Sequence, residues 1–178
     1  MQLSSELEAP SQYSILVITP LEKLQENLND VMKVLTKQQI SGVYVSLNKP
    51  YRSIQQIFSD NKIDTGKVFF IDCIASKEAK AEKVREVLHL DDPTDLRPLD
   101  DSVKSYLKEM PGEKYVVIDA LSTLLIYNDK KEVAKFVKSL TEHAVEFKVK
   151  TVALSPKTGD NELLTYIFNF FDKVIQMD

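Results

Sequence analysis

The chain of 178 residues carries a net charge of −4, is 43% hydrophobic and has 28% charged residues. This length is enough to bury one core without disulfides, and the acidic balance argues against a general nucleic-acid binder, which needs an excess of Lys and Arg. The single cysteine, Cys73, excludes an intrachain disulfide and a cysteine-cluster metal site. Residues 1–12 lack the pattern of a signal peptide, and no run of about 18 apolar residues occurs, so we expect a cytoplasmic protein without a membrane partner.

The first half of the chain alternates apolar strands with amphipathic helices. Residues 1–12 are polar and are predicted to form a tail before a single domain, residues 13–178. Short β-branched runs predict strands, and apolar residues at spacings of three and four predict helices. In this half, strands are predicted at 13–19, 43–47 and 67–72, and helices at 21–38 and around 54–58.

The second half continues the alternation after a charged, Ala-rich segment, residues 76–83, which is predicted to be a connection or one or two helical turns. The predicted elements that follow are a short strand at 84–90, a helix at 99–110, a strand at 114–119, a helix at 133–147, a strand at 149–154, a helix that begins at Asp160 or Asn161 and ends near 171, and a last strand at 173–177. Strands that alternate with helices throughout predict an α/β fold, a doubly wound, mostly parallel sheet with helices on both faces.

Residues 114–125, with the sequence Lys-Tyr-Val-Val-Ile-Asp-Ala-Leu-Ser-Thr-Leu-Leu, are the central stretch of this predicted sheet. An apolar run without polar alternation is typical of a strand buried on both faces. The run ends in Asp119, at the carboxyl edge where open parallel sheets hold their ligands. We therefore expect any ligand site to lie near Asp119 and the following Ser122.

Five stretches, taken in order, resemble the RecA-like ATPase core, and most closely its archaeal KaiC-like branch. The stretches are 43–47 followed by Pro50, 68–72, 92–96, 116–125 and 172–175. The resemblance covers nearly the whole chain from residue 13 onward. It implies a nucleotide site at the junction of the first strand and first helix, and an acid at Asp119 that would face Mg²⁺.

The phosphate-binding loop that the resemblance implies is missing from this sequence. Relatives use G-x-x-x-x-G-K-[ST], in which backbone amides close around the phosphates, but residues 17–26 contain no glycine. Thr19, Pro20 and Glu22 instead fit the N-cap, N1 and N3 positions, where the Thr hydroxyl and Glu carboxylate are predicted to satisfy the free amides. Glu22 and Glu26 also place negative charge where a triphosphate would lie. We predict a helix end closed by its own side chains.

A second departure concerns catalysis. KaiC-like relatives commonly end the second strand in a pair of glutamates, one of which activates water, whereas this chain has Asn48 and Lys49. An amide is not basic and an ammonium is already protonated, so neither residue is a general base at neutral pH. One carboxylate, Asp119, binds Mg²⁺ too weakly without a phosphate to share the ion. We therefore expect no enzyme activity, metal or cofactor.

Cysteine and histidine chemistry is also not expected. Cys73 lacks a neighbour in sequence that would lower its pKa, and it is predicted to be a structural thiol. His89 and His143 have no acid or cysteine at ligand spacing, which argues against zinc. His143 is predicted to lie at the boundary of the apolar face of its helix.

The leading hypothesis is a non-catalytic RecA-like domain that binds a protein, either a second copy or another RecA-like protein, in archaeal signalling. Tyr166 and Phe170 widen the apolar surface of the last helix and are candidate interface residues, unless they cover the sheet edge within the monomer. The alternative is a ligand sensor or weak nucleotide binder with its site at Thr19, Asn48, Lys49, Asp72, Asp119 and Ser122. A third hypothesis is an enzyme with a repurposed site at Asp72 and Asp119.

Overall fold

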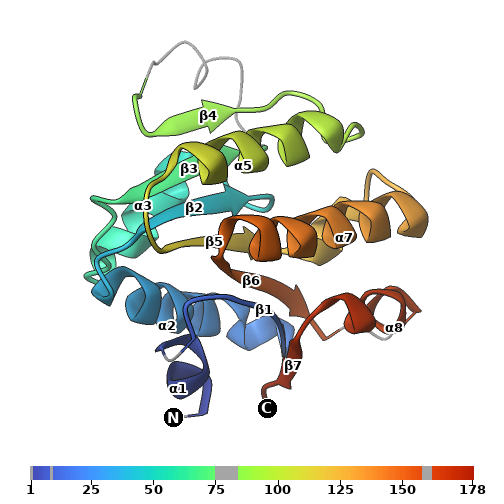
Figure 1. Ribbon diagram of the computed structural model, residues 1–178, viewed down its shortest axis with the longest axis horizontal. Coiled ribbons are helices and arrows are strands. Elements are labelled where there is room, and N and C mark those ends of the chain that lie inside the picture. Colours follow the sequence, from blue (N-terminus) through green and yellow to red (C-terminus); the bar gives the residue numbers. More distant parts are fainter. Residues whose placement is uncertain (1, 9, 75–83, 158–161) are drawn as a thin grey trace.

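A computed structural model describes residues 2–8, 10–74, 84–157 and 162–178. The described residues form one parallel sheet with the strand order β4-β3-β2-β5-β6-β1-β7 (Figure 1). Its strands are β1 (Tyr13–Thr19), β2 (Ser41–Ser46), β3 (Val68–Asp72), β4 (Val87–His89), β5 (Lys114–Asp119), β6 (Val149–Pro156) and β7 (Lys173–Gln176). All six strand pairings are parallel, which confirms the predicted sheet.

Helices cover both faces of the sheet (Figure 1). One face carries α1 (Gln2–Glu8), α2 (Leu24–Lys37) and α3 (Tyr51–Asp60). The other carries α5 (Arg97–Glu109), α6 (Leu121–Leu124), α7 (Lys130–Phe147) and α8 (Glu162–Ile167). Short 3₁₀ turns, η1 (Leu21–Lys23) and η2 (Phe168–Phe170), precede α2 and follow α8. The fold is therefore doubly wound, as predicted. Among the described residues, no helix combines the length and the apolarity that crossing a bilayer demands.

The strands are buried on both faces, and their side chains alternate between two cores. Along β5, Val116 and Ile118 belong to the core under α5 and α7, whereas Tyr115 and Val117 belong to the core under α2 and α3. All six side chains of β5 are buried, as the unbroken apolar run predicts. The central strand therefore contributes to the cores on both sides of the sheet.

The segment predicted as a polar tail contains a packed helix, so this part of the prediction is wrong. Gln2–Glu8 form α1, whose Leu3 and Leu7 are buried against the core that contains α2. The Leu7 carbonyl accepts hydrogen bonds from the Tyr13 hydroxyl and the Gln38 amide, both at 3.1 Å. Leu3 and Leu7 lie on the same side of the helix because they are four residues apart. Two apolar residues in one helical turn are too few for the sequence to predict a packed helix.

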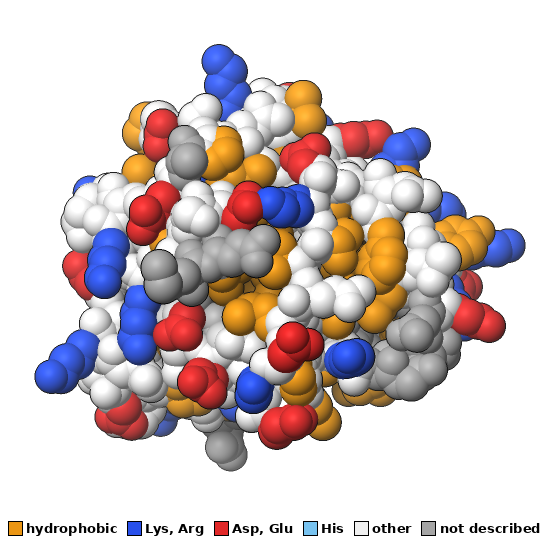
Figure 2. Space-filling view, turned by 90° about the horizontal axis from the view of Figure 1, so that it is seen from below, with side chains coloured by type: hydrophobic (Ala, Val, Ile, Leu, Met, Phe, Trp, Pro, Cys, Tyr) orange, Lys and Arg blue, Asp and Glu red, His pale blue; other side chains and the backbone are white. Residues whose placement is uncertain are grey.

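The two terminal elements lie side by side at the lower side of Figure 1. Lys173 at the start of β7 forms an ion pair with Glu6 of α1. Figure 2 shows this side of the molecule, where apolar side chains remain visible at the centre among charged ones. This ion pair therefore connects the first helix of the chain to the start of its last strand.

Two predicted features lie outside the described residues. They are the connection at 76–83 and the helix start at Asp160 or Asn161. The short strand predicted at 84–90 is confirmed as β4. The helix predicted at 21–38 is divided into η1 and α2.

Leu7→Ala tests the packing of α1. Leu7 is fully buried, so its truncation removes apolar contacts and leaves a cavity, and we expect the free energy of unfolding to fall by about 2–4 kcal/mol in urea denaturation. Glu8→Ala, at an exposed position at the end of the same helix, is the control and is expected to change stability by less than about 0.5 kcal/mol. Equal small effects in both variants would mean that α1 does not pack as described.

Candidate functional site

A crevice opens at the carboxyl edge of the sheet, where the chain after β1, β2, β5 and β6 converges. Its volume is about 360 Å³. The lining residues are Leu21, Leu24, Gln25, Leu28, Asn48, Lys49, Asp119, Ser122, Thr123 and Pro156. Four of the six predicted ligand residues are among them, and Thr19 and Asp72 are not. Leucines from η1 and α2 form an apolar wall, which faces amide, hydroxyl and charged groups.

Asp119 is the buried acid of this crevice. Its residue is 1% exposed, and both carboxylate oxygens accept hydrogen bonds. The Tyr44 hydroxyl donates to one oxygen at 2.6 Å, and the Asn48 amide donates to the other at 3.2 Å. Burial raises the pKa of Asp119, while these two donors and the charge of Lys49 oppose the rise. The acid is therefore already supplied with donors from within the chain.

The loop after β2 joins three elements across the crevice. The Asn48 amide oxygen accepts a hydrogen bond from the Thr123 hydroxyl on α6 while its nitrogen donates to Asp119. The Lys49 ammonium donates to the Gln25 side chain on α2 at 3.0 Å. Asn48 and Lys49 thus bridge α2, β5 and α6. Sequence reasoning placed both residues correctly at the strand end, but their partners lie far away in the sequence.

The segment from Thr19 to α2 is closed, but not by the predicted capping box. Neither η1 nor α2 has a side-chain cap. The backbone amide of Lys23 donates to the Pro20 carbonyl at 3.0 Å, and the fully buried Thr19 hydroxyl accepts from the Asn27 amide. The prediction fails because a 3₁₀ turn uses i→i+3 backbone bonds, and because Asn27 on α2 takes the Thr19 hydroxyl.

Asp72 lies outside the crevice, and its carboxylate accepts hydrogen bonds from backbone amides. Its carboxylate accepts from the amide of Tyr51, at the start of α3, and from the amide of Ile74, both at 2.8 Å. His89 Nδ1 on β4 lies 3.4 Å from the same carboxylate. The histidine therefore has an acidic neighbour that its sequence spacing did not reveal.

The two acids at this edge do not form a pair. Ser46 of β2 is the register partner of Asp72 on one side and Asp119 on the other. Their backbones are therefore two interstrand spacings apart, roughly 10 Å. The hypothesis of one repurposed acid–acid site has no support from this arrangement.

Cys73 is poorly suited to nucleophilic chemistry. Burial, with a smaller contribution from the charge of Asp72, raises the pKa of the thiol to about 12. A thiol with this pKa is almost wholly protonated at neutral pH. Among the described residues, no three His, Cys, Asp or Glu side chains come together to hold a metal ion.

His143 is buried between α5 and α7, so its predicted boundary position is wrong. The residue is 5% exposed, and its Nε2 lies 3.0 Å from Asp100 Oδ1 and 3.3 Å from Ser139 Oγ. In a serine-hydrolase triad, the two imidazole nitrogens contact the acid and the serine separately. Here one nitrogen faces both groups, so the cluster joins two helices and does not form a triad. Asp100 explains the burial, but it lies 43 residues away in the sequence.

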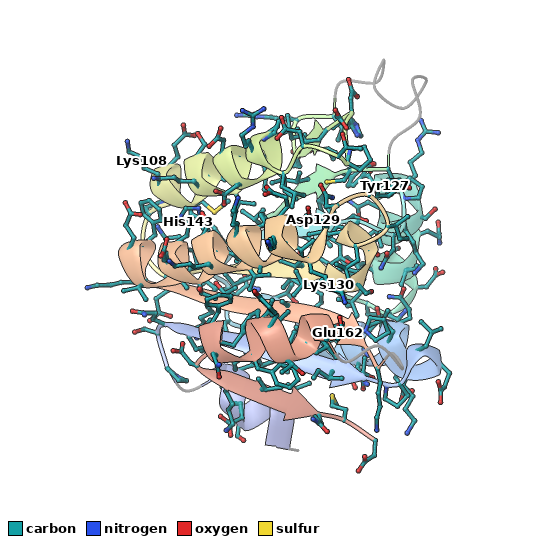
Figure 3. All side chains as sticks on the ribbon, turned by 90° about the vertical axis from the view of Figure 1, so that its right-hand side faces the viewer. Lys108, Tyr127, Asp129, Lys130, His143 and Glu162 are labelled. Atoms are coloured by element: carbon teal, nitrogen blue, oxygen red, sulfur yellow. The ribbon has the colours of Figure 1, made fainter. Side chains whose placement is uncertain are left out.

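The two candidate interface residues differ in exposure. Tyr166 is 60% exposed, whereas Phe170 is half-buried and packs against the core. Three further exposed apolar side chains lie at the carboxyl edge, and we define the carboxyl-edge surface as Leu21, Ile126 and Tyr127. Figure 3 shows Tyr127 near Asp129 at one end of α7, with His143 toward the other end.

Comparison with solved structures defines the class of fold. A KaiC-like protein from the archaeon Pyrococcus horikoshii OT3 matches with a TM-score of 0.67 and 14% identity over 93% of this chain and 71% of that chain. An uncharacterised protein from Pyrococcus horikoshii, crystallised with an unknown peptide, matches with a TM-score of 0.71 and 14% identity over 99% and 82%. A solved ATPase domain matches with a TM-score of 0.60 and 12% identity over 95% and 70%. The chain has the RecA-like, KaiC-like fold.

The sequence also defines a family. Residues 9–178 match the model of DUF7090, a family of unknown function, and the chain belongs to this family. No curated protein matches the sequence.

Asp119→Asn tests the state of the buried acid. An unfolded Asp has a pKa of about 3.9, and burial raises the folded value, so the folded state keeps the proton to higher pH. The stability that Asp119 contributes is therefore present below about pH 4 and is lost as the pH rises through the folded pKa. We expect the wild type to lose stability relative to Asp119→Asn across this window in urea denaturation from about pH 3 to 8. A relative gain with rising pH would mean that the hydrogen bonds outweigh burial.

Proposed function

We propose that this chain is a non-catalytic RecA-like domain that acts by binding a protein, either a second copy or an active RecA-like ATPase, in an archaeal regulatory or signalling setting. The observation that carries the proposal is the internal use of the polar groups at the carboxyl edge. Asp119 accepts from Tyr44 and Asn48, and Lys49 donates to Gln25. A nucleotide with Mg²⁺ would have to compete with these bonds.

The turn after β1 supports the same conclusion. An anion-binding loop needs several backbone amides that point at one ligand, and glycines usually permit that geometry. Here the amide of Lys23 is bonded to Pro20, and the nearby Glu22 side chain is exposed beside the turn. Negative charge and a closed turn both disfavour a triphosphate. Asn48 and Lys49 supply no general base for an attacking water.

The carboxyl-edge surface is the proposed place of contact. Ile126 and Tyr127 are 73% and 48% exposed, and Leu21, at the mouth of the crevice, is 68% exposed. Exposed apolar and aromatic side chains at the centre of an interface commonly supply most of its binding energy. The P. horikoshii neighbour crystallised with an unknown peptide is a protein of this fold that holds a peptide.

An association assay with matched variants tests this proposal. We expect light scattering across a concentration series, or recovery of a partner from extract, to show binding that Ile126→Ser/Tyr127→Ser weakens by at least about tenfold. Val145→Ser, which removes an exposed apolar side chain from the distant end of α7, is the control and is expected to keep full binding. Two results together would contradict the proposal. They are a wild type that stays monomeric at all concentrations, and an extract from which the wild type recovers no protein that the double variant fails to recover.

Hydrolysis assays test the non-catalytic part of the proposal. Wild type and Asp119→Asn are expected to release phosphate from ATP at the same background rate, because no residue of the crevice activates water. A rate in the wild type that disappears in Asp119→Asn while the fold remains intact would establish an enzyme.

The crevice supports a second candidate, a ligand sensor or weak nucleotide binder. Its volume of about 360 Å³ and its combination of leucine and polar walls are typical of small-molecule pockets. Thermal-shift measurements with ATP, GTP, cyclic dinucleotides and Mg²⁺ distinguish this function. A ligand at about one hundred times its Kd stabilises the folded chain by about 2.7 kcal/mol, so a shift that is lost in Asn48→Ala would favour the sensor over the proposal above.

A further inference from the structure

Two cavities lie at the amino-terminal edge of the sheet, opposite the crevice. The larger has a volume of about 100 Å³ and is lined by Lys33, Thr36, Lys37, Gln39, Lys62 and Asp64. The smaller, of about 10 Å³, is lined by Thr36, Gln39, Ile40, Asp64, Lys67, Val68 and Tyr115. The two cavities share three residues and therefore adjoin. We call them together the amino-edge pocket.

The pocket is basic although the chain is acidic. Four lysines and Asp64 line it, and Asp30 pairs with one of the lysines, Lys33, so the local net charge is about +2, against −4 for the whole chain. The carboxyl ends of α2 and α3 lie beside it and together contribute about −1, since each helix end carries roughly −0.5. About one positive charge therefore remains after the two helix ends are counted.

Two of the four lysines have no side-chain bonding partner among the residues that the structure describes. Lys37 and Lys62 make no hydrogen bond or ion pair through their side chains with any of the residues that the structure describes. Lys33 lies 3.8 Å from Asp30 in an exposed pair of little energetic value, and Lys67 donates to the Gln39 carbonyl at 2.6 Å. Two ammonium groups at the rim are thus available to an anion.

The floor of the pocket contains an unpartnered hydroxyl. Tyr115 is fully buried, and its OH has no hydrogen-bond partner among the described residues. The ring is fixed in place because it lies on Gly42, where an added Cβ would come within 2.0 Å of Tyr115 Cζ. Burying a hydroxyl without a partner costs free energy unless an acceptor reaches it. The smaller cavity, which Tyr115 lines, has room for about one oxygen atom of water size.

We propose that the amino-edge pocket binds the phosphate group of a small molecule. Lys37 and Lys62 neutralise and hydrogen-bond the phosphate oxygens at the rim, and the Tyr115 hydroxyl donates toward the oxygen that enters the smaller cavity. Asp64 is the one acid of the lining, and its carboxylate accepts from the Gly66 amide at 2.9 Å, so the lining stays net positive. This site shares no residue with the carboxyl-edge crevice, so it stands or falls independently of the proposed function.

Calorimetric titration with sodium phosphate tests the site, with sodium chloride at equal ionic strength as the reference. We expect saturable binding to the wild type that weakens by at least about tenfold in Lys37→Gln/Lys62→Gln. Lys108→Gln, on α5 and labelled in Figure 3, removes an exposed lysine elsewhere and is expected to keep the wild-type affinity. No saturable binding, or equal weakening in both variants, would overturn the proposal.

Tyr115→Phe separates a ligand contact from a purely structural role. Removal of the unpartnered hydroxyl is expected to raise the melting temperature without phosphate and to weaken phosphate binding by at least about threefold. An unchanged Kd would overturn the role of Tyr115 in binding. Titration with glycerol 3-phosphate distinguishes the two possible ligands of the site. Tighter binding than that of inorganic phosphate would identify a phosphate monoester as the ligand, and equal binding would identify the free phosphate ion.

Discussion

The buried carboxylate of Asp119 is the constraint on which the carboxyl edge of this fold depends. A carboxylate that is 1% exposed at the end of a doubly buried strand must find hydrogen-bond donors within the protein. Tyr44 on the neighbouring strand and Asn48 after it supply them. Because Asn48 also accepts from Thr123, the hydrogen bonds of one acid connect β2, the loop after β2 and α6. These hydrogen bonds lie in the lining of the crevice at the carboxyl edge.

The same sheet treats its two edges differently. At the carboxyl edge, Lys49 is bonded to Gln25, so the cation beside the buried acid is already engaged. At the amino edge, the side chains of Lys37 and Lys62 remain without partners among the described residues, and the buried hydroxyl of Tyr115 lies in the adjoining cavity. The two edges of one RecA-like sheet therefore differ in how many of their charged side chains are bonded within the chain.

Sequence patterns predicted the features that depend on local periodicity. The apolar run of β5 and the helix stripes indicated the parallel, doubly wound sheet, and the position of Asp119 at its edge followed from that topology. Sequence patterns gave wrong predictions where a side chain bonds to a residue distant in the sequence, or where the apolar face of a helix has only a few residues. Asp100 is what allows His143 to be buried, and α1 has only Leu3 and Leu7 to show that it packs. The start of α2 was predicted wrongly because the Thr19 hydroxyl bonds to Asn27 and a 3₁₀ turn replaces the expected capping box. Residue propensities alone do not show which of these arrangements is more stable.

The most direct test is a crystal structure of this chain grown with Mg²⁺ and a saturating non-hydrolysable ATP analogue. The account predicts that the Asn48–Asp119 and Lys49–Gln25 hydrogen bonds remain, that the turn from Thr19 to Leu24 stays closed, and that no nucleotide lies in the crevice. A triphosphate seated beside Glu22, with Asp119 released from Tyr44 and Asn48 to face the metal, would contradict it.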